Sequence, residues 1–256
     1  MAFTIAVAGK GGTGKSTVSG LIIRALVERQ AGPVLAIDAD PNSNLGELLG
    51  LEVETTIGEL QAETLEKIRD LPAGVPLSRH LEYELHQSIV ESEGVDLLVM
   101  GRGEGPGCYC AVNNILRRYF STLRGAYKYA VLDNEAGMEH LARRVSHGVD
   151  LLLLVSDANP VALRAVARIA TLSDELELEV GSRYLILNRL QAEISERGAE
   201  EVERSGLDVI ARIPHDEEIV TLNLDGRPLS ALRSDAASLA EINRMLATVL
   251  PEEEGE

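Results

Sequence analysis

The chain contains no tryptophan, two phenylalanines and six tyrosines. Proteins that bind single-stranded nucleic acid stack the bases on aromatic side chains, so this composition argues against that class of function. Basic residues are also scarce, because 24 lysines and arginines stand against 41 aspartates and glutamates, which gives a formal net charge of −17. A surface of that sign repels nucleic acid and anionic lipid. The composition therefore predicts that neither nucleic acid nor a membrane is a partner.

The sequence also lacks any apolar run long enough to cross a bilayer. An apolar, strand-like run begins at residue 3 and leaves no room for a secretion signal, so we expect a cytoplasmic protein. A length of 256 residues fits one large α/β domain, which we place at residues 1–250. Residues 251–256 are mostly acidic and predict a disordered tail.

Short apolar runs alternate with segments of helical periodicity along the chain. The runs are rich in β-branched residues and leucine, as is typical of parallel strands that are covered on both faces. This alternation predicts an α/β fold, a doubly wound, mostly parallel sheet with helices on both faces. Residues 54–92 are expected to be helical with a short irregular excursion. The expected strands are residues 4–8, 34–37, 95–100, 129–132, 151–155, 184–187 and 209–213, and the expected helices are residues 16–29, 113–123, 160–173 and 234–250.

The loop after the first expected strand matches the pattern G-x-x-x-x-G-K-[ST] and precedes a helical segment, which is the order that a phosphate-binding loop requires. Glycines let backbone N–H groups curl around phosphates. We expect Lys15 to reach the β- and γ-phosphates of a nucleotide and the Ser16 hydroxyl to bind Mg²⁺. The residues of this loop are Gly9, Lys10, Gly11, Gly12, Thr13, Gly14, Lys15, Ser16 and Thr17.

Three polar residues are candidates for further roles at the same nucleotide site. Lys10 lies early in the loop and points away from the phosphates that its own loop wraps, so its charge is available elsewhere. Asp38 and Asp133 each follow an apolar run, at the carboxyl ends of strands where such sheets bind ligands. An aspartate after a strand downstream of a phosphate loop matches the Walker B pattern, whose carboxylate holds Mg²⁺ through water. The alternative for Asp133 is an ordinary helix cap at a strand end.

The two cysteines of the chain, Cys108 and Cys110, are separated by one residue in a glycine-rich segment. A disulfide is disfavoured in a reducing cytoplasm and would be strained in so short a loop. Two thiolates supply half of a tetrahedral sulfur site, and the same pair from a second subunit would complete it. Soft thiolates suit Zn²⁺, Ni²⁺ or Cu⁺, and the spacing does not choose among them. Two unligated thiols are the alternative interpretation.

The segment K-G-G-T-G-K-S at residues 10–16 resembles the deviant Walker A loop of the nucleotide-dependent dimerising ATPases. That superfamily of P-loop NTPases includes the Min and Par ATPases, the nitrogenase iron protein and metallocluster assembly ATPases. The resemblance implies ATP and ADP as ligands, hydrolysis of ATP and a homodimer. It implies that Lys10 reaches the partner's phosphates, that Lys15 acts in cis, that Asp40 orients the attacking water, and that Asp38 lies near the magnesium ion.

The resemblance extends to two other regions. Asn188, Arg189 and Pro214 would flank adenine, whereas without the resemblance Asn188 reads as a turn residue at a strand end. The Ala-Gly pair at residues 136–137 matches switch II, but Glu135 stands where Min and Par relatives commonly have proline. The role of Glu135 stays open, as does that of His140, and the departure favours the metallocluster branch.

Residues 10–16, 100–110 and 133–140 together closely resemble the carbon monoxide dehydrogenase accessory ATPases of the CooC type, over nearly the whole chain. This resemblance implies an ATP-dependent metallochaperone that assists nickel insertion into carbon monoxide dehydrogenase. One Ni²⁺ or Zn²⁺ ion per dimer would be bound by Cys108 and Cys110 of both chains. Which metal is physiological, which enzyme is the client, and whether the protein carries the ion or remodels the client stay open.

Two alternatives belong to the same superfamily. A nitrogenase-iron-protein-like ATPase or an iron–sulfur cluster carrier would place its cysteines at other positions and spacings. A Min- or Par-type positioning ATPase would need a basic surface or a basic amphipathic end, and the C-terminal segment runs instead into the acidic residues 252–254.

Overall fold

The computed structural model describes residues 2–67, 77–102, 122–123, 125–135 and 148–251. Within these ranges, one sheet has the strand order β3-β4-β2-β5-β1-β6-β7-β8. Neighbouring strands are parallel except for the pair of β3 and β4. The strands are β1 (Phe3–Gly9), β2 (Val34–Asp38), β3 (Val90–Glu91), β4 (Val95–Val99), β5 (Tyr129–Asp133), β6 (Val149–Ser156), β7 (Val180–Leu190) and β8 (Val209–Pro214).

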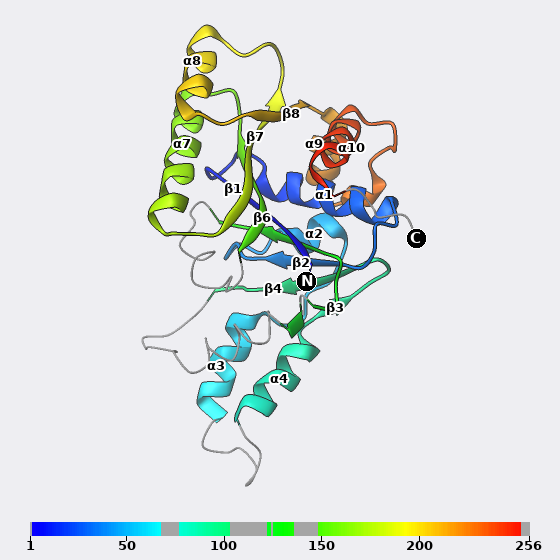
Figure 1. Cartoon of the computed structure of the whole chain (residues 1–256). Coiled ribbons are helices and arrows are strands. Elements are labelled where there is room, and N and C mark those ends of the chain that lie inside the picture. The colour runs from blue at the N-terminus through cyan, green and yellow to red at the C-terminus, as the bar shows by residue number, and fades with distance from the viewer. Residues whose placement is uncertain (1, 68–76, 103–121, 124, 136–147, 252–256) are drawn as a thin grey trace.

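Helices cover both faces of the sheet (Figure 1). The first face packs against α1 (Lys15–Glu28), α2 (Leu45–Leu49), α9 (Glu217–Leu224), the 3₁₀ helix η1 (Leu229–Ala231) and α10 (Ala237–Val249). The second packs against α3 (Ile57–Lys67), α4 (Leu77–Gln87), α7 (Pro160–Glu175) and α8 (Glu196–Ser205).

The strands are apolar along their length because both of their faces are buried. In β1, Ile5 and Val7 belong to the core under α1 and α10, whereas Ala6 and Ala8 belong to the core under α7. Successive side chains of a strand point to opposite faces, so a strand that is covered twice needs apolar residues at every position. This confirms the predicted doubly wound, mostly parallel α/β fold.

The seven predicted strands and three of the four predicted helices correspond to observed elements. The helix expected at residues 113–123 lies largely outside the described residues, and so do residues 252–256 of the predicted tail. Residues 54–92 contain α3, α4 and β3. The single-domain boundary at residue 250 stays a prediction. Within the described ranges, no helix has the length and apolar character needed to cross a bilayer.

Three short helices were not predicted. The five-residue helix α2 is too short for a periodic pattern, and α8 is so rich in charge that few apolar positions mark its buried face. The third, α9, buries apolar residues on one side as an amphipathic helix does. It is only eight residues long and begins soon after β8, so its apolar pattern is too short to be separated from that of the strand. Periodicity identifies long helices best, because each additional turn repeats the apolar stripe.

The topology brings the ends of distant segments to one edge of the sheet. The strands β2, β5, β1, β6 and β7 are consecutive neighbours and run parallel, so their carboxyl ends meet there. Ligands of such sheets bind in the crevice outside these carboxyl ends. The segments that follow the strands at this edge therefore form the candidate site.

Candidate functional site

The glycine-rich loop joins β1 to α1 and is fixed against β6. At Gly9 a side chain is excluded, since a Cβ atom there would lie 2.2 Å from the Val155 carbonyl oxygen. Thr13 is almost fully buried, and its Oγ1 lies 2.8 Å from the Lys10 carbonyl oxygen and 3.2 Å from that of Val155. The Thr13 side chain therefore closes the loop on itself and attaches it to the neighbouring strand.

The two lysines of the loop occupy different environments. Lys15 begins α1, is 7% exposed, and its Nζ lies 3.5 Å from the Lys10 carbonyl oxygen. The Lys10 residue itself is exposed to solvent. The Lys15 side chain is therefore buried beside the loop, whereas Lys10 is accessible to a second molecule.

Asp133 ends β5 beneath the start of α1. Its Oδ1 accepts a hydrogen bond from the Ser19 hydroxyl at 3.1 Å, whereas its buried Oδ2 has no hydrogen-bond partner among the described residues. Burial raises the pKa of Asp133 to about 6, and the hydroxyls of Ser16 and Ser19 and the charge of Lys15 oppose that rise. An unsatisfied carboxylate oxygen next to the loop serine fits a divalent cation, which prefers oxygen ligands. The residues present therefore fit Mg²⁺.

Asp38 ends β2 and is the register partner of Asp133 on β5. Its Oδ1 accepts a hydrogen bond from the Asp40 N–H at 3.1 Å, and its Oδ2 accepts one from the Leu45 N–H at 2.9 Å. Burial is the largest cause that raises the pKa of Asp38 to about 7, and the charge of Asp133 adds to the rise. Asp38 therefore shapes the turn into α2 and contributes a second buried carboxyl group to the same edge.

Asp40 lies two residues beyond Asp38 and is partly exposed. Its Oδ1 accepts hydrogen bonds from the backbone N–H and the Nδ2 of Asn42, at 2.8 and 2.9 Å. This Asx-type turn holds the carboxylate at the surface of the loop. Its expected role in orienting water stays a prediction.

The structure brings the residues predicted to flank a base next to the loop. Asn188 donates from Nδ2 to the Thr13 carbonyl oxygen at 2.8 Å, and Arg189 donates from Nη1 to the Gly12 carbonyl oxygen at 2.9 Å. Pro214 ends β8 as the register partner of Leu190 on β7. The three residues share the carboxyl edge of β7 and β8, and their contact with adenine stays a prediction.

Several predicted residues cannot be placed. Cys108, Cys110 and His140 lie outside the described residues, and so does the Ala-Gly pair at residues 136–137. Glu135 is described and partly buried, but its role stays open. Among the described residues, no group of three or more histidine, cysteine, aspartate or glutamate side chains is arranged to hold a metal ion.

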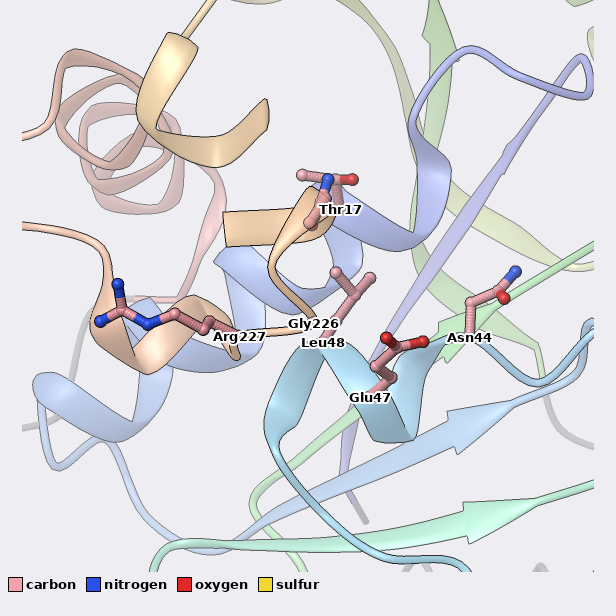
Figure 2. A pocket seen from close by; sticks show the side chains of 7 residues that line it. Thr17, Asn44, Glu47, Leu48, Gly226 and Arg227 are labelled. Carbon is pink, nitrogen blue, oxygen red and sulfur yellow. The ribbon is translucent and has the colours of Figure 1, made fainter. Parts of the chain in front are cut away.

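A cleft of about 210 Å³ opens beside Thr17, the last residue of the predicted loop (Figure 2). Its lining includes Asn44 and Glu47 at the start of α2 and Arg227 in the turn after α9. The lining carries one acid and one base, so charge alone favours neither an anion nor a cation.

Sequence reasoning missed two side chains that shape the site. The Ser19 hydroxyl donates to the Asp133 carboxylate. The signal for it in the sequence is its position three residues after Ser16, which puts both hydroxyls on one face of α1. Thr13 was included in the loop without a role, because its hydroxyl partner Val155 is distant in sequence.

Comparison with known proteins identifies the family. The model of the CobQ/CobB/MinD/ParA nucleotide binding domain matches residues 4–229. An uncharacterized ATP-binding protein of Methanocaldococcus jannaschii is 40% identical over 88% of this chain and 89% of its own. The carbon monoxide dehydrogenase accessory protein CooC of Rhodospirillum rubrum is 30% identical over 96% of this chain and 95% of its own.

A solved structure agrees on the fold. The septum site-determining protein MinD of Pyrococcus horikoshii, in complex with Mg-ADP, superposes with a TM-score of 0.70 at 23% identity and covers 97% of this chain and 96% of its own. At that identity the match shows a shared fold. The resemblance to the deviant Walker A superfamily is confirmed by these relatives.

Proposed function

Because the chain belongs to the CobQ/CobB/MinD/ParA nucleotide binding domain family, we propose that it is a Mg²⁺-dependent ATPase that acts as a homodimer. The observation that carries this proposal is the buried Oδ2 of Asp133, which has no hydrogen-bond partner among the described residues. A buried carboxylate oxygen that accepts no hydrogen bond is costly. A Mg²⁺ ion held at this edge would supply the missing positive charge.

Different residues of the site have different proposed roles in phosphoryl transfer. Ser16, Asp38 and Asp133 would hold the magnesium ion, which would neutralise charge on the phosphate oxygens. Lys15, at the buried start of α1, binds the β- and γ-phosphates of the same chain. Asp40, held at the surface of its turn, orients the attacking water.

The dimer supplies the remaining charge. Lys10 is exposed, whereas Lys15 already lies within the loop. A lysine in that position acts on the phosphates of a partner chain, in the way that an arginine finger supplied in trans stabilises transition-state charge. A monomer then lacks one catalytic cation, so intrinsic turnover is slow and depends on protein concentration.

We further propose that this ATPase serves a metal site formed by Cys108 and Cys110 of both chains, which takes Ni²⁺ or Zn²⁺ as cargo for a nickel-dependent carbon monoxide dehydrogenase. The relative from Rhodospirillum rubrum, named as an accessory protein of that enzyme, supports this client. A pair of thiolates from each chain supplies a tetrahedral site for a soft cation.

The position of β4 supports coupling between the two sites. The cysteines follow β4, whose neighbour in the sheet is β2. The Met100 N–H donates to the Asp38 carbonyl oxygen at 2.8 Å, and the Gly58 N–H donates to the Met100 carbonyl oxygen at 2.9 Å. A cleft of about 270 Å³ separates Ser43, in the turn after Asp40, from Arg102. The Met100–Asp38 contact is the route by which a shift of the Asp40 turn would reach the start of the cysteine segment.

Two substitutions test the ATPase proposal. Lys15→Ala should abolish ATP binding, whereas Lys10→Ala should bind ATP and lose hydrolysis. Lys128→Ala is the matched control, because this exposed lysine precedes β5 at the opposite end of the strand from Asp133. Binding is measured by calorimetry and hydrolysis by phosphate release. Normal hydrolysis in Lys10→Ala would contradict the role of the partner's lysine.

Metal analysis tests the cargo proposal. The reduced protein should bind one Ni²⁺ or Zn²⁺ ion per two chains in the presence of ATP, and Cys108→Ala or Cys110→Ala should remove that binding. Liposome flotation and a DNA mobility shift at several salt concentrations test a Min- or Par-type function in the same preparations. Binding to either, without metal binding, would replace the metallochaperone proposal.

A further inference from the structure

The two residues that end β7 contact the backbone of the phosphate loop rather than open solvent. Asn188 is 5% exposed and donates from Nδ2 to the Thr13 carbonyl oxygen, and Arg189 donates from Nη1 to the Gly12 carbonyl oxygen. These are consecutive carbonyl groups of the loop. Both side chains therefore hold the same short stretch of backbone from one side.

The backbone of Gly14 is packed against both side chains. A Cβ atom on Gly14 would lie 2.5 Å from Asn188 Nδ2 and 3.4 Å from Nε and Nη2 of Arg189. Gly14 also has a φ of 86°, in the left-handed region that favours glycine. The close contact and the left-handed backbone together fix the last turn of the loop before α1.

The orientation of these carbonyl groups determines the orientation of an amide. In a trans peptide the C=O and the following N–H point in opposite directions. Because Asn188 Nδ2 donates to the Thr13 carbonyl oxygen, the following Gly14 N–H faces away from Asn188. In the proposed nucleotide site, the phosphates lie on that side of the loop. Backbone N–H groups on that side are the donors that cradle phosphates.

Arg189 adopts an unusual backbone conformation at a register irregularity of β7 between Leu187 and Leu190. Its φ is 56°, a region that non-glycine residues other than asparagine, aspartate and histidine seldom occupy. Strained residues persist when surrounding contacts over-determine them, and they cluster at functional sites. The guanidinium of this residue lies against the loop, where Nη1 donates to the Gly12 carbonyl oxygen.

We propose that Asn188 and Arg189 are positioning residues, which preorganise the phosphate loop by holding the Gly12 and Thr13 carbonyl groups. The inference rests on the proposed function to the extent that the loop binds a nucleotide. This role differs from recognition of the base, because it contributes to the binding free energy of the phosphate groups. Preorganised donors need no reorientation when the ligand binds, so loss of either contact weakens binding of any polyphosphate.

Variants of Arg189 give the clearest test, since this side chain is exposed and its loss leaves the core intact. Arg189→Asn tolerates the left-handed φ but is too short to reach the loop, whereas Arg189→Lys retains a long donor. The probes are ATP, GTP and inorganic tripolyphosphate, each with Mg²⁺. Arg168→Asn, on an exposed position of α7, is the matched control.

Arg189→Asn should weaken binding of all three probes by the same factor, about tenfold, with kcat changed less than KM and with partial recovery in Arg189→Lys. The factor should be the same at low and high ionic strength. A loss confined to ATP would assign Arg189 to the base, and a loss that vanishes at high salt would assign it to direct contact with phosphate charge. Either result, or unchanged binding, overturns the proposal.

The variant Asn188→Ala tests the positioning role independently of Arg189. It should reduce tripolyphosphate affinity as Arg189→Asn does, in a protein whose circular dichroism and melting temperature are checked first. Undiminished tripolyphosphate binding in a folded Asn188→Ala protein would contradict the proposal. If the wild-type protein bound none of the three probes, the proposed ATPase function would itself have failed, which is distinguishable from failure of the positioning role.

Discussion

Asp38 and Asp133 are register partners at the carboxyl ends of the neighbouring strands β2 and β5, and both are fully buried. Each carboxyl group has a raised pKa, about 7 for Asp38 and about 6 for Asp133, chiefly because burial disfavours the charged form. Neutral residues at this buried edge would avoid the desolvation that raises both pKa values. The proposed magnesium site would give both carboxylates a cation to bind.

The raised pKa values predict that stability falls as pH rises when Mg²⁺ is absent. Between the unfolded pKa of about 4 and the folded values, the native protein holds protons that the unfolded chain has released. The stabilising contribution is therefore complete below about pH 4 and is lost as pH rises through about 6 to 7. Melting temperatures in buffers with chelator should be lower at pH 8 than at pH 5.

The same carboxylates should reverse this trend when ligand is present. Mg²⁺ competes with protons for Asp38 and Asp133, so Mg²⁺ with a non-hydrolysable ATP analogue should raise the melting temperature more at pH 8 than at pH 5. Asp133→Asn is the matched control and should reduce both dependences, leaving the part that Asp38 contributes. Equal stabilisation at the two pH values would contradict a magnesium site at this edge.

Asp133→Asn should have opposite effects on stability and on catalysis. The amide keeps a hydrogen-bonding partner for Ser19 and removes a buried charge, so the unliganded protein should become more stable at pH 8. Mg²⁺-dependent hydrolysis should fall by about a hundredfold or more, since the magnesium ligand is lost. Denaturant unfolding and phosphate release are measured on the same preparation. A variant that is destabilised and fully active would show that Asp133 serves only as a structural residue.

The sequence predicted this edge of the sheet well, because strands that are buried on both faces leave continuous apolar runs and the polar residues after them stand out. The contacts of Asn188 and Arg189 with the loop could not be predicted, since they join residues about 175 positions apart, through backbone carbonyl groups that carry no sequence signal. Ser19 was recoverable in principle from its spacing to Ser16. The helix α8 was missed because its charged residues conceal a narrow buried face.

Mixing two inactive variants tests whether Lys10 acts in trans. Lys10→Ala and Asp40→Ala should each be inactive as homodimers. In a mixed dimer, the chain with Lys10→Ala keeps its own Asp40 and receives an intact Lys10 from its partner, so one of the two sites is complete. Equal mixing should restore roughly a quarter of the wild-type rate, because half of the dimers are mixed and each has one competent site.

A mixture of Lys10→Ala and Lys15→Ala should also recover activity. In its mixed dimers, the chain with Lys10→Ala keeps its own Lys15 and receives Lys10 from its partner, so one site is again complete. If Lys10 acted on its own chain's phosphates, neither mixture would exceed the sum of its components. Exchange of chains is checked with a tagged copy, so that failure to recover activity is separated from failure to mix.

Metal and nucleotide binding should be coupled reciprocally through the dimer. The proposed four-thiolate site would require Cys108 and Cys110 of both chains, and the proposed ATP site would require Lys10 of the partner. Each ligand should therefore favour the same dimer. The Met100–Asp38 contact at 2.8 Å joins the strand that precedes the cysteines to the strand that carries the magnesium ligand. Any factor by which an ATP analogue raises metal affinity must equal the factor by which the metal raises analogue affinity.

Two titrations measure this coupling: Zn²⁺ or Ni²⁺ affinity with and without a non-hydrolysable ATP analogue, and analogue affinity with and without the metal. Both should shift by the same factor, about 5- to 100-fold, and metal affinity should rise with pH as the thiols deprotonate. Cys108→Ala should remove the metal's effect on the analogue while leaving analogue binding intact, which separates coupling from damage to the loop. Identical metal affinity in both nucleotide states would leave an ATPase with an unrelated pair of thiols, because hydrolysis would then have no means of releasing the ion to its client.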